Sequence, residues 1–232
     1  MALFLKLLGL LLLPWILQGP LPDGWLHFLD PRVWRRKPSR EKILYLTFDD
    51  GPNPKATPLI LDTLKEKGIP ATFFVVGESA LKHRELIQRA REEGHLLAGH
   101  SFSHRHAYLL FPWEAVREVK ESQKVLQTLT GEEPRYFRPP WGSFSLPLWW
   151  ALRRERLIPV LWSILPGDWK PLSKEELWRR VRRLLKPGAI LVLHDGRGHP
   201  EAPLATARNL PYLLEKIRGE GYRFRRLDEA PQ

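Results

Sequence analysis

The sequence predicts an α/β fold in which about seven parallel strands form a closed or nearly closed (β/α) barrel. Seven short apolar segments recur along the chain, amphipathic helical segments separate them, and 232 residues suit a single core. So many short apolar strands alternating with helices favour a barrel over an open sheet. The expected strands span residues 43–48, 71–76, 95–99, 136–138, 158–162, 189–193 and 222–225.

The expected helices follow from apolar residues that recur every three or four positions. Glycines punctuate several helix ends, for example Gly68 and Gly131, where a left-handed residue commonly ends a helix. The helices are expected near residues 57–67, 79–93, 113–129, 145–156, 174–185 and 206–219.

The N-terminal segment has a different composition. An unbroken apolar stretch runs from Leu7 to Leu17 behind Lys6, which is typical of a signal peptide or membrane anchor over residues 1–18. Residues 2–17 are slightly fewer than the ~17–25 of a bilayer-spanning helix. A cleaved peptide, an uncleaved anchor, an interfacial helix and a buried N-terminal helix therefore all remain open.

Two further regions complete the predicted organisation. Residues 19–42 are rich in proline, glycine and charge, so they are interpreted as a linker. Residues 43–228 are interpreted as one folded domain. We expect this domain to be exported, either anchored at the membrane and facing outward or secreted.

Composition excludes some kinds of chemistry. The chain has no cysteine, so it has no disulfide, no cysteine-based metal site and no thiol nucleophile. Its net charge of +11 is spread along the chain, which indicates either a solvated basic surface or attraction to an anionic polymer or lipid surface. Nucleic-acid binding is not favoured, because no basic stripe with interleaved aromatic residues is evident.

Two strand ends carry candidate metal ligands. Functional groups in a (β/α) barrel come from the C-terminal ends of the strands. The first strand ends at the adjacent carboxylates Asp49 and Asp50, and the third is followed by His100 and His104. Two imidazoles and one carboxylate leave an open coordination position, as a catalytic zinc requires. A plain turn and an exposed histidine pair are the alternative interpretations.

Three further strand ends carry complementary groups. Arg138 ends the fourth strand, where a guanidinium would pair with a carboxylate, and Trp141 has the first backbone N–H after two prolines. Asp168 and Trp169 follow the fifth strand. His194 follows the sixth strand, where it can act as an acid or base, and an orienting aspartate would raise its pKa.

In this order the segments resemble the five motifs of the polysaccharide deacetylases, also called the NodB-homology group or carbohydrate esterase family four. The resemblance covers roughly residues 43–227. It implies a deformed (β/α) barrel and a divalent metal ion, and it implies removal of acetyl groups from amino sugars such as chitin and peptidoglycan, or of O-acetyl groups from xylan. The motifs lie at residues 47–51, 100–104, 138–142, 168–169 and 193–194.

The resemblance also implies a role for each motif residue. Asp50, His100 and His104 would bind one divalent metal ion, expected to be zinc, with cobalt, nickel and manganese as alternatives. The implied catalytic residues are the general base Asp49 with its tether Arg138, and the general acid His194 with its orienting partner Asp168. The implied oxyanion and substrate pocket consists of Trp141, Trp169 and Leu193.

Two positions depart from the family pattern. Leu165 stands three places before the Asp-Trp pair, where members often carry an acidic residue, and Val192 stands where leucine is usual. The first departure bears on the support of His194, and the second bears on the shape of the pocket.

The expected function is metal-dependent removal of N-acetyl groups, by hydrolysis of amide bonds that are not peptide bonds. The expected partner is an acetylated polysaccharide or oligosaccharide, most plainly peptidoglycan or a chitin-type oligomer. Membrane association is expected through residues 2–17. An O-acetyl xylan esterase and a non-catalytic glycan-binding or metal-binding module are the alternatives.

Overall fold

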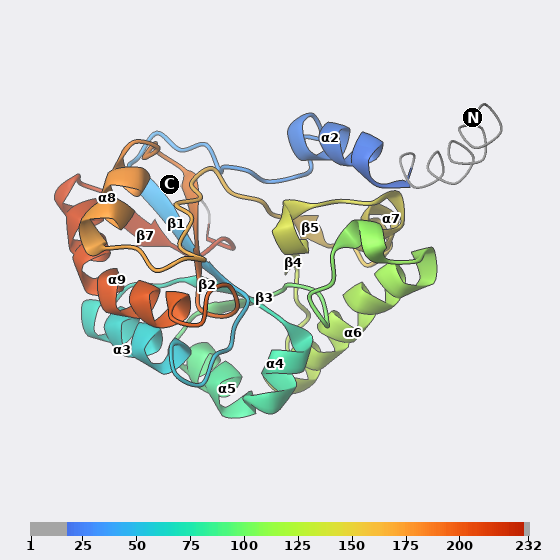
Figure 1. The fold of residues 1–232 in the computed structure, drawn as a ribbon, viewed down its shortest axis with the longest axis horizontal. Coiled ribbons are helices and arrows are strands. Elements are labelled where there is room, and N and C mark those ends of the chain that lie inside the picture. Colours follow the sequence, from blue (N-terminus) through green and yellow to red (C-terminus); the bar gives the residue numbers. More distant parts are fainter. Residues whose placement is uncertain (1–17, 230–232) are drawn as a thin grey trace, which may run out of the picture.

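The computed structural model describes residues 18–229 and contains one parallel sheet (Figure 1). The strands pair in the order β5-β4-β3-β2-β1-β6, with β7 beside the start of β1. All seven predicted strands are present, so the predicted α/β class is confirmed. They are β1 (Ile43–Asp49), β2 (Thr72–Val75), β3 (Leu96–Gly99), β4 (Tyr136–Phe137), β5 (Ile158–Pro159), β6 (Ala189–His194) and β7 (Arg223–Arg225).

The sheet curls back on itself just beyond β5. The amides of Ser163 and Ile164 donate to the carbonyl oxygen of Ile190 in β6, at 3.0 and 3.1 Å, and the Val192 amide donates to the oxygen of Ile164 at 3.0 Å. The strand predicted over residues 158–162 is shorter than expected and covers only Ile158–Pro159. The amide of Val160 still bonds to β4, but the amide of Leu161 bonds to Trp34 instead. This closure confirms a deformed barrel.

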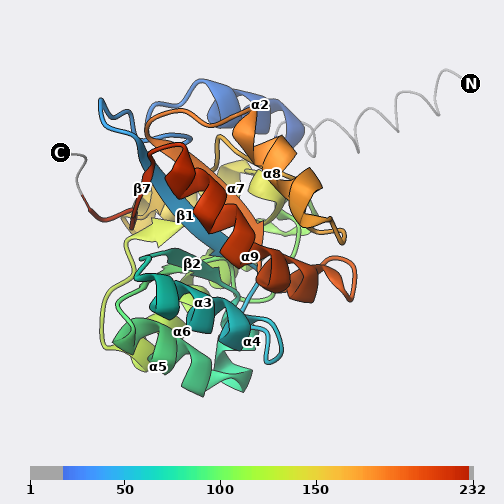
Figure 2. The same cartoon turned by 90° about the vertical axis from the view of Figure 1, so that its left-hand side faces the viewer.

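Helices surround the outside of the strands (Figures 1 and 2). The predicted helix 79–93 is divided at His83, whose backbone (φ −130, ψ 54) leaves the helical region. The other five predicted helices are confirmed. The helices of the domain are α3 (Thr57–Lys67), α4 (Gly77–Lys82), α5 (Arg84–Glu92), α6 (Pro112–Thr130), α7 (Leu146–Arg154), α8 (Lys174–Arg182) and α9 (Ala202–Gly219), with 3₁₀ turns η1 (Ala107–Leu109) and η2 (Pro140–Gly142).

Side chains of β1 alternate between two cores. Leu44 and Leu46 belong to the cluster that packs under the helices, whereas Tyr45 belongs to a separate cluster within the barrel. Because successive side chains of a strand point to opposite faces, Thr47 and Asp49 share the face of Tyr45. This alternation directs Asp49 into the barrel at the C-terminal end of β1.

The segment interpreted as a linker is folded onto the domain, which corrects that interpretation. It contains helix α2 (Pro20–Phe28), and Leu26 of this helix is buried in a core shared with α6 and α7. The amide of Trp34 donates to Pro159 at 2.8 Å, and the amide of Lys37 donates to Gly188 at 2.9 Å. The segment thus contacts both β5 and the start of β6. Composition did not reveal this because the contacts are between distant parts of the chain.

The predicted signal peptide or anchor falls almost wholly on residues 1–17, which lie outside the described residues. Between residues 18 and 229, the structure contains no helix with the length and apolar character needed to cross a bilayer.

Candidate metal centre and active site

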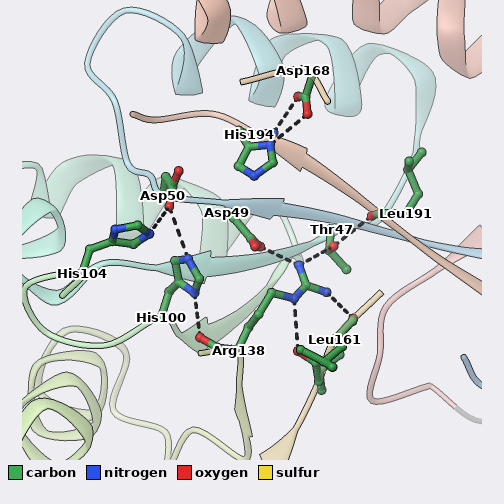
Figure 3. A network of polar contacts seen from close by, with 11 residues as sticks. Thr47, Asp49, Asp50, His100, His104, Arg138, Leu161, Asp168, Leu191 and His194 are labelled. Atoms are coloured by element: carbon green, nitrogen blue, oxygen red, sulfur yellow. Dashed lines mark hydrogen bonds and ion pairs between the residues drawn. The ribbon is translucent and has the colours of Figure 1, made fainter. Parts of the chain in front are cut away.

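Asp50, His100 and His104 come together at the C-terminal ends of β1 and β3 (Figure 3). The Asp50 Oδ1 atom lies 3.2 Å from His100 Nε2 and 2.8 Å from His104 Nε2. The candidate ligand atoms of the three residues all lie within 4.8 Å of one another. The structure therefore brings together the three ligands predicted from the sequence.

The hydrogen bonding of His100 supports a cation between these groups. Its Nδ1 atom lies 2.7 Å from the carbonyl oxygen of Arg138, so Nδ1 carries the proton in this contact. In the neutral imidazole, Nε2 then presents a lone pair toward the Asp50 carboxylate, itself an acceptor. Ligand atoms ~2.1 Å from a tetrahedral metal lie about 3.4 Å apart, which is close to the observed spacing. The residues therefore fit one divalent ion.

The backbone holds these ligands in uncommon conformations. Asp50, Ser101 and His104 have positive φ angles of 76°, 63° and 58°. Such conformations in non-glycine residues are costly and concentrate at functional sites. The Glu118 carboxylate of α6 accepts hydrogen bonds from the amides of Phe102 and Ser103 at 2.9 and 2.8 Å. These bonds fasten the loop between His100 and His104 to helix α6.

Asp49 is paired with a fully buried arginine. Arg138 Nη1 donates to Asp49 Oδ1 at 2.5 Å and to Thr47 Oγ1 at 2.8 Å. Its other nitrogens donate to the carbonyl oxygens of Val160 and Leu161. Burial lowers the pKa of Arg138, and the charge and hydrogen bond of Asp49 oppose this effect. The guanidinium is therefore held rigidly, and it orients the Asp49 carboxylate.

His194 is paired with Asp168 beside the same cavity. His194 Nδ1 lies 2.8 Å from Asp168 Oδ1, and the His194 amide donates to Asp168 Oδ2 at 2.8 Å. Burial alone would lower the pKa of His194, but the charge and hydrogen bond of Asp168 raise it to about 9, helped by Asp49 and Asp50. The imidazole is thus protonated at neutral pH.

Asp168 has a hydrogen-bond partner even though leucine stands at position 165, where family members often carry an acidic residue. Thr206 of α9 donates its hydroxyl to Asp168 Oδ2 at 3.0 Å. Leu165 instead lines the cavity. The His194–Asp168 pair therefore does not depend on a carboxylate at position 165.

A cavity of about 520 Å³ joins the metal cluster to both pairs. Trp141 and Trp169 lie on its wall, as predicted, and the Trp141 ring centroid is 4.5 Å from that of His104. Trp141 is in the left-handed region, with φ 56°. The cavity is lined by Asp49, Asp50, His100, His104, Trp141, Trp162, Leu165, Trp169, His194, Arg197 and Gly198.

Leu193 does not line this cavity, which corrects its predicted role. It is fully buried in the core under the helices, with Leu191. Because side chains alternate along β6, the inward position of His194 directs Leu193 outward. The residue two places before the histidine, Val192, shares its face instead.

Sequence reasoning missed the residues that hold the loops together. Buried Asp195 accepts a 2.5 Å hydrogen bond from the Thr57 hydroxyl, and its amide donates to the Asp49 carbonyl oxygen at 3.1 Å. A Cβ added to Gly51 would lie only 2.1 Å from Asp195 Oδ2, so this turn requires glycine. The only sequence feature that pointed to Asp195 was its position directly after His194. Nothing in the sequence pointed to Glu118, which lies in the middle of helix α6.

In metal-free protein, the His194–Asp168 pair is expected to stabilise the fold at low pH. The folded pKa of about 9 exceeds the ordinary 6.5, so the contribution is complete below 6.5 and is lost as the pH rises through about 9. Urea unfolding of wild type and His194→Gln at about pH 6 and about pH 10 checks this. The difference in unfolding free energy should shrink by up to a few kcal/mol, since one pKa unit is about 1.4 kcal/mol. An unchanged difference would contradict the pairing.

Comparisons with known proteins relate this chain to characterised sequences and structures. The sequence model of the family described as polysaccharide deacetylase matches residues 36–157. The chitooligosaccharide deacetylase of Bradyrhizobium sp. (strain ANU 289) is 34% identical over 193 residues, which cover 79% of this chain and 88% of the relative. The peptidoglycan-N-acetylglucosamine deacetylase PgdA of Listeria monocytogenes is 34% identical over 83% of this chain, which spans only 40% of that longer protein.

A solved structure shows the same fold over nearly the whole chain. The peptidoglycan N-acetylglucosamine deacetylase Bc1960 superposes with a TM-score of 0.80 at 29% identity, covering 88% of this chain and 94% of its own. This superposition extends the likeness beyond the segment matched by the family model, which ends before Asp168 and His194. The chain therefore belongs to the metal-dependent polysaccharide deacetylase family.

Proposed function

We propose that this protein removes N-acetyl groups from an amino-sugar polymer, either peptidoglycan or a chitin-type oligosaccharide. Water is added across the amide bond, and the products are acetate and a free amine. The relatives named for chitooligosaccharide and peptidoglycan deacetylation support this substrate class. The observation that carries the proposal is one cavity containing the Asp50-His100-His104 cluster, the Asp49–Arg138 pair and the His194–Asp168 pair.

The two pairs suit opposite proton transfers. The Asp49 carboxylate, oriented by Arg138, takes the proton of the attacking water. Asp168 orients the His194 ring and raises its pKa, which suits His194 to give its proton to the departing amine. A backbone N–H such as that of Trp141 can stabilise the developing oxyanion, a contact of a kind worth about 3–4 kcal/mol.

We further propose that the metal ion is zinc, with cobalt, nickel and manganese as alternatives. When bound, it supplies Lewis acidity, which lowers the pKa of water and polarises an acyl oxygen. Two imidazoles and one carboxylate form a donor set that suits zinc and leaves a position open.

His104→Ala is expected to weaken zinc binding by more than 100-fold, because it deletes one of three ligands. This exceeds the ~10–100-fold loss typical of residues that only orient a ligand. Isothermal titration calorimetry on metal-stripped protein measures the effect. His83→Ala, at the junction of α4 and α5, serves as the matched control. Equal zinc affinity in wild type and His104→Ala would exclude this ligand set.

The activity is tested by incubating zinc-loaded protein with chitooligosaccharides, muropeptides and acetylated xylan. Mass spectrometry should show the loss of acetyl groups from the first or second substrate, with free acetate formed in equal amount. Release from xylan alone would indicate an O-acetyl esterase. No release from any substrate, with zinc bound, would indicate a non-catalytic module and overturn the proposal.

We also propose that the domain acts in the cell envelope, with residues 2–17 as its export signal or anchor. The apolar stretch behind Lys6 supports this location. Fractionation of cells that express the full chain should recover it with the envelope or in the medium. Recovery in the cytosol would contradict the proposal.

A further inference from the structure

Helix α2 presents a continuous apolar face to solvent. Leu21, Trp25, Phe28 and the adjoining Leu29 are 63%, 51%, 73% and 68% exposed. Their spacing of four, three and one residues gathers them on one side of a helix. The folding of the domain does not require this face, because Leu26, on another side of α2, makes the contact with the core.

The orientation of α2 is set by polar contacts with the loops of the active site. Asp23 accepts hydrogen bonds from the Tyr108 hydroxyl and from the Phe144 amide. His27 Nδ1 lies 3.3 Å from the carbonyl oxygen of Gly142, next to the cavity residue Trp141. The exposed face is therefore a defined part of the surface, close to the loop that forms one wall of the cavity.

A basic groove includes Arg32, which is three residues after Leu29 of this face. It has a volume of about 420 Å³, and its lining contains Arg32, Arg153 and Arg156 with the indoles of Trp34 and Trp149, but no acidic residue. The Arg32 guanidinium, which pairs with Asp30, lies 4.7 Å from the centre of the Trp149 ring. Arg153 and Arg156 are exposed at the end of α7. Such a groove suits an anionic group beside apolar surface.

We propose that the apolar face of α2 and this basic groove together bind an anionic lipid bilayer surface. Leucine, phenylalanine and tryptophan on one face of a helix bury favourably at the headgroup boundary, and neighbouring arginines are attracted to anionic headgroups. The apolar run from Leu7 to Leu17 leads directly into α2, so both would meet lipid together.

This surface is distinct from anchoring by residues 2–17, and it does not depend on the catalytic proposal. Anchoring by residues 2–17 alone would keep α2 near the lipid without fixing which side of the helix faces it. Docking of α2 holds the domain in one orientation, with the Trp141 side of the cavity near the lipid surface.

The absence of cysteine allows a direct test in the full chain. Phe28→Cys and the control Leu59→Cys, on the exposed surface of α3, each carry an environment-sensitive fluorophore. With vesicles of phosphatidylglycerol and phosphatidylcholine, the label at position 28 should shift to the blue and be quenched by spin-labelled lipid. The label at position 59 should do neither. An unchanged label at position 28 in vesicle-bound protein would overturn the proposal.

The groove is tested by Arg153→Gln and Arg156→Gln. Each change should weaken binding to the anionic vesicles about fivefold, the equivalent of ~1 kcal/mol per basic residue at a membrane surface. Deacetylation of soluble oligosaccharide should be unchanged. Equal vesicle affinity in wild type and the double variant would overturn the role of the groove. A label at position 28 that is already blue-shifted without vesicles would show that another part of the protein or a second copy covers α2, and would overturn bilayer docking.

Discussion

Asp49→Asn is expected to reduce kcat by about 10² to 10⁴-fold, the range that a positioned general base contributes. Asparagine keeps the size of the side chain and an oxygen that accepts from Arg138, but it cannot take a proton from water at neutral pH. Metal binding should be retained, because the ligand cluster uses the neighbouring Asp50. Initial rates of acetate release, with zinc content measured in the same samples, test this result.

A matched control separates this effect from a general loss of charge. Asp62→Asn changes an exposed carboxylate of α3 that pairs with Arg89 and does not line the cavity. Its kcat should equal that of the wild type. A zinc-loaded Asp49→Asn enzyme with wild-type turnover would show that Asp49 is not the base.

Arg138→Met is expected to destabilise the fold by about 3–5 kcal/mol, as is typical when one partner of a buried ion pair is removed. Arg138 has no exposed surface, and its guanidinium satisfies Asp49, Thr47 and two carbonyl oxygens of the chain beyond β5. Methionine fills part of the volume but leaves a buried carboxylate without its counter-charge. Urea unfolding at neutral pH measures the loss.

The double variant Arg138→Met with Asp49→Asn identifies the cause of this loss. If the unpaired carboxylate is responsible, the second change should recover a substantial part of the lost free energy. Additive losses would instead assign the destabilisation to the carbonyl oxygens and to packing. A single Arg138→Met variant as stable as the wild type would show that the pair does not support the fold.

The strands and the ligand cluster were predictable because both depend on local sequence. Apolar runs are short and regularly interrupted, and Asp50, His100 and His104 stand immediately after such runs. Parallel strands place their C-terminal ends at one edge, so residues distant in sequence become neighbours. The error at Leu193 was avoidable, because alternation from His194 already directs that side chain outward.

The N-terminal segment was predicted less well. A stretch rich in proline, glycine and charge is typical of linkers, yet residues 34–37 bond to both β5 and the start of β6. Those bonds use backbone groups, which every sequence supplies, so composition carries no sign of them. Asp195 and Glu118 are similar, because each acts on a loop that belongs to another part of the chain.

The amino-acid sequence alone determined the alternation of strands and helices and the chemical groups that stand at the strand ends, because both follow from periodicity and residue type. The metal-ligand, acid and base roles of those groups are what the family resemblance implies. The tertiary structure decided which aspartate pairs with Arg138, how His194 keeps its proton, how the barrel closes and where α2 faces solvent. Each of these depends on distances between segments far apart in the chain, and such distances exist only after the chain has folded.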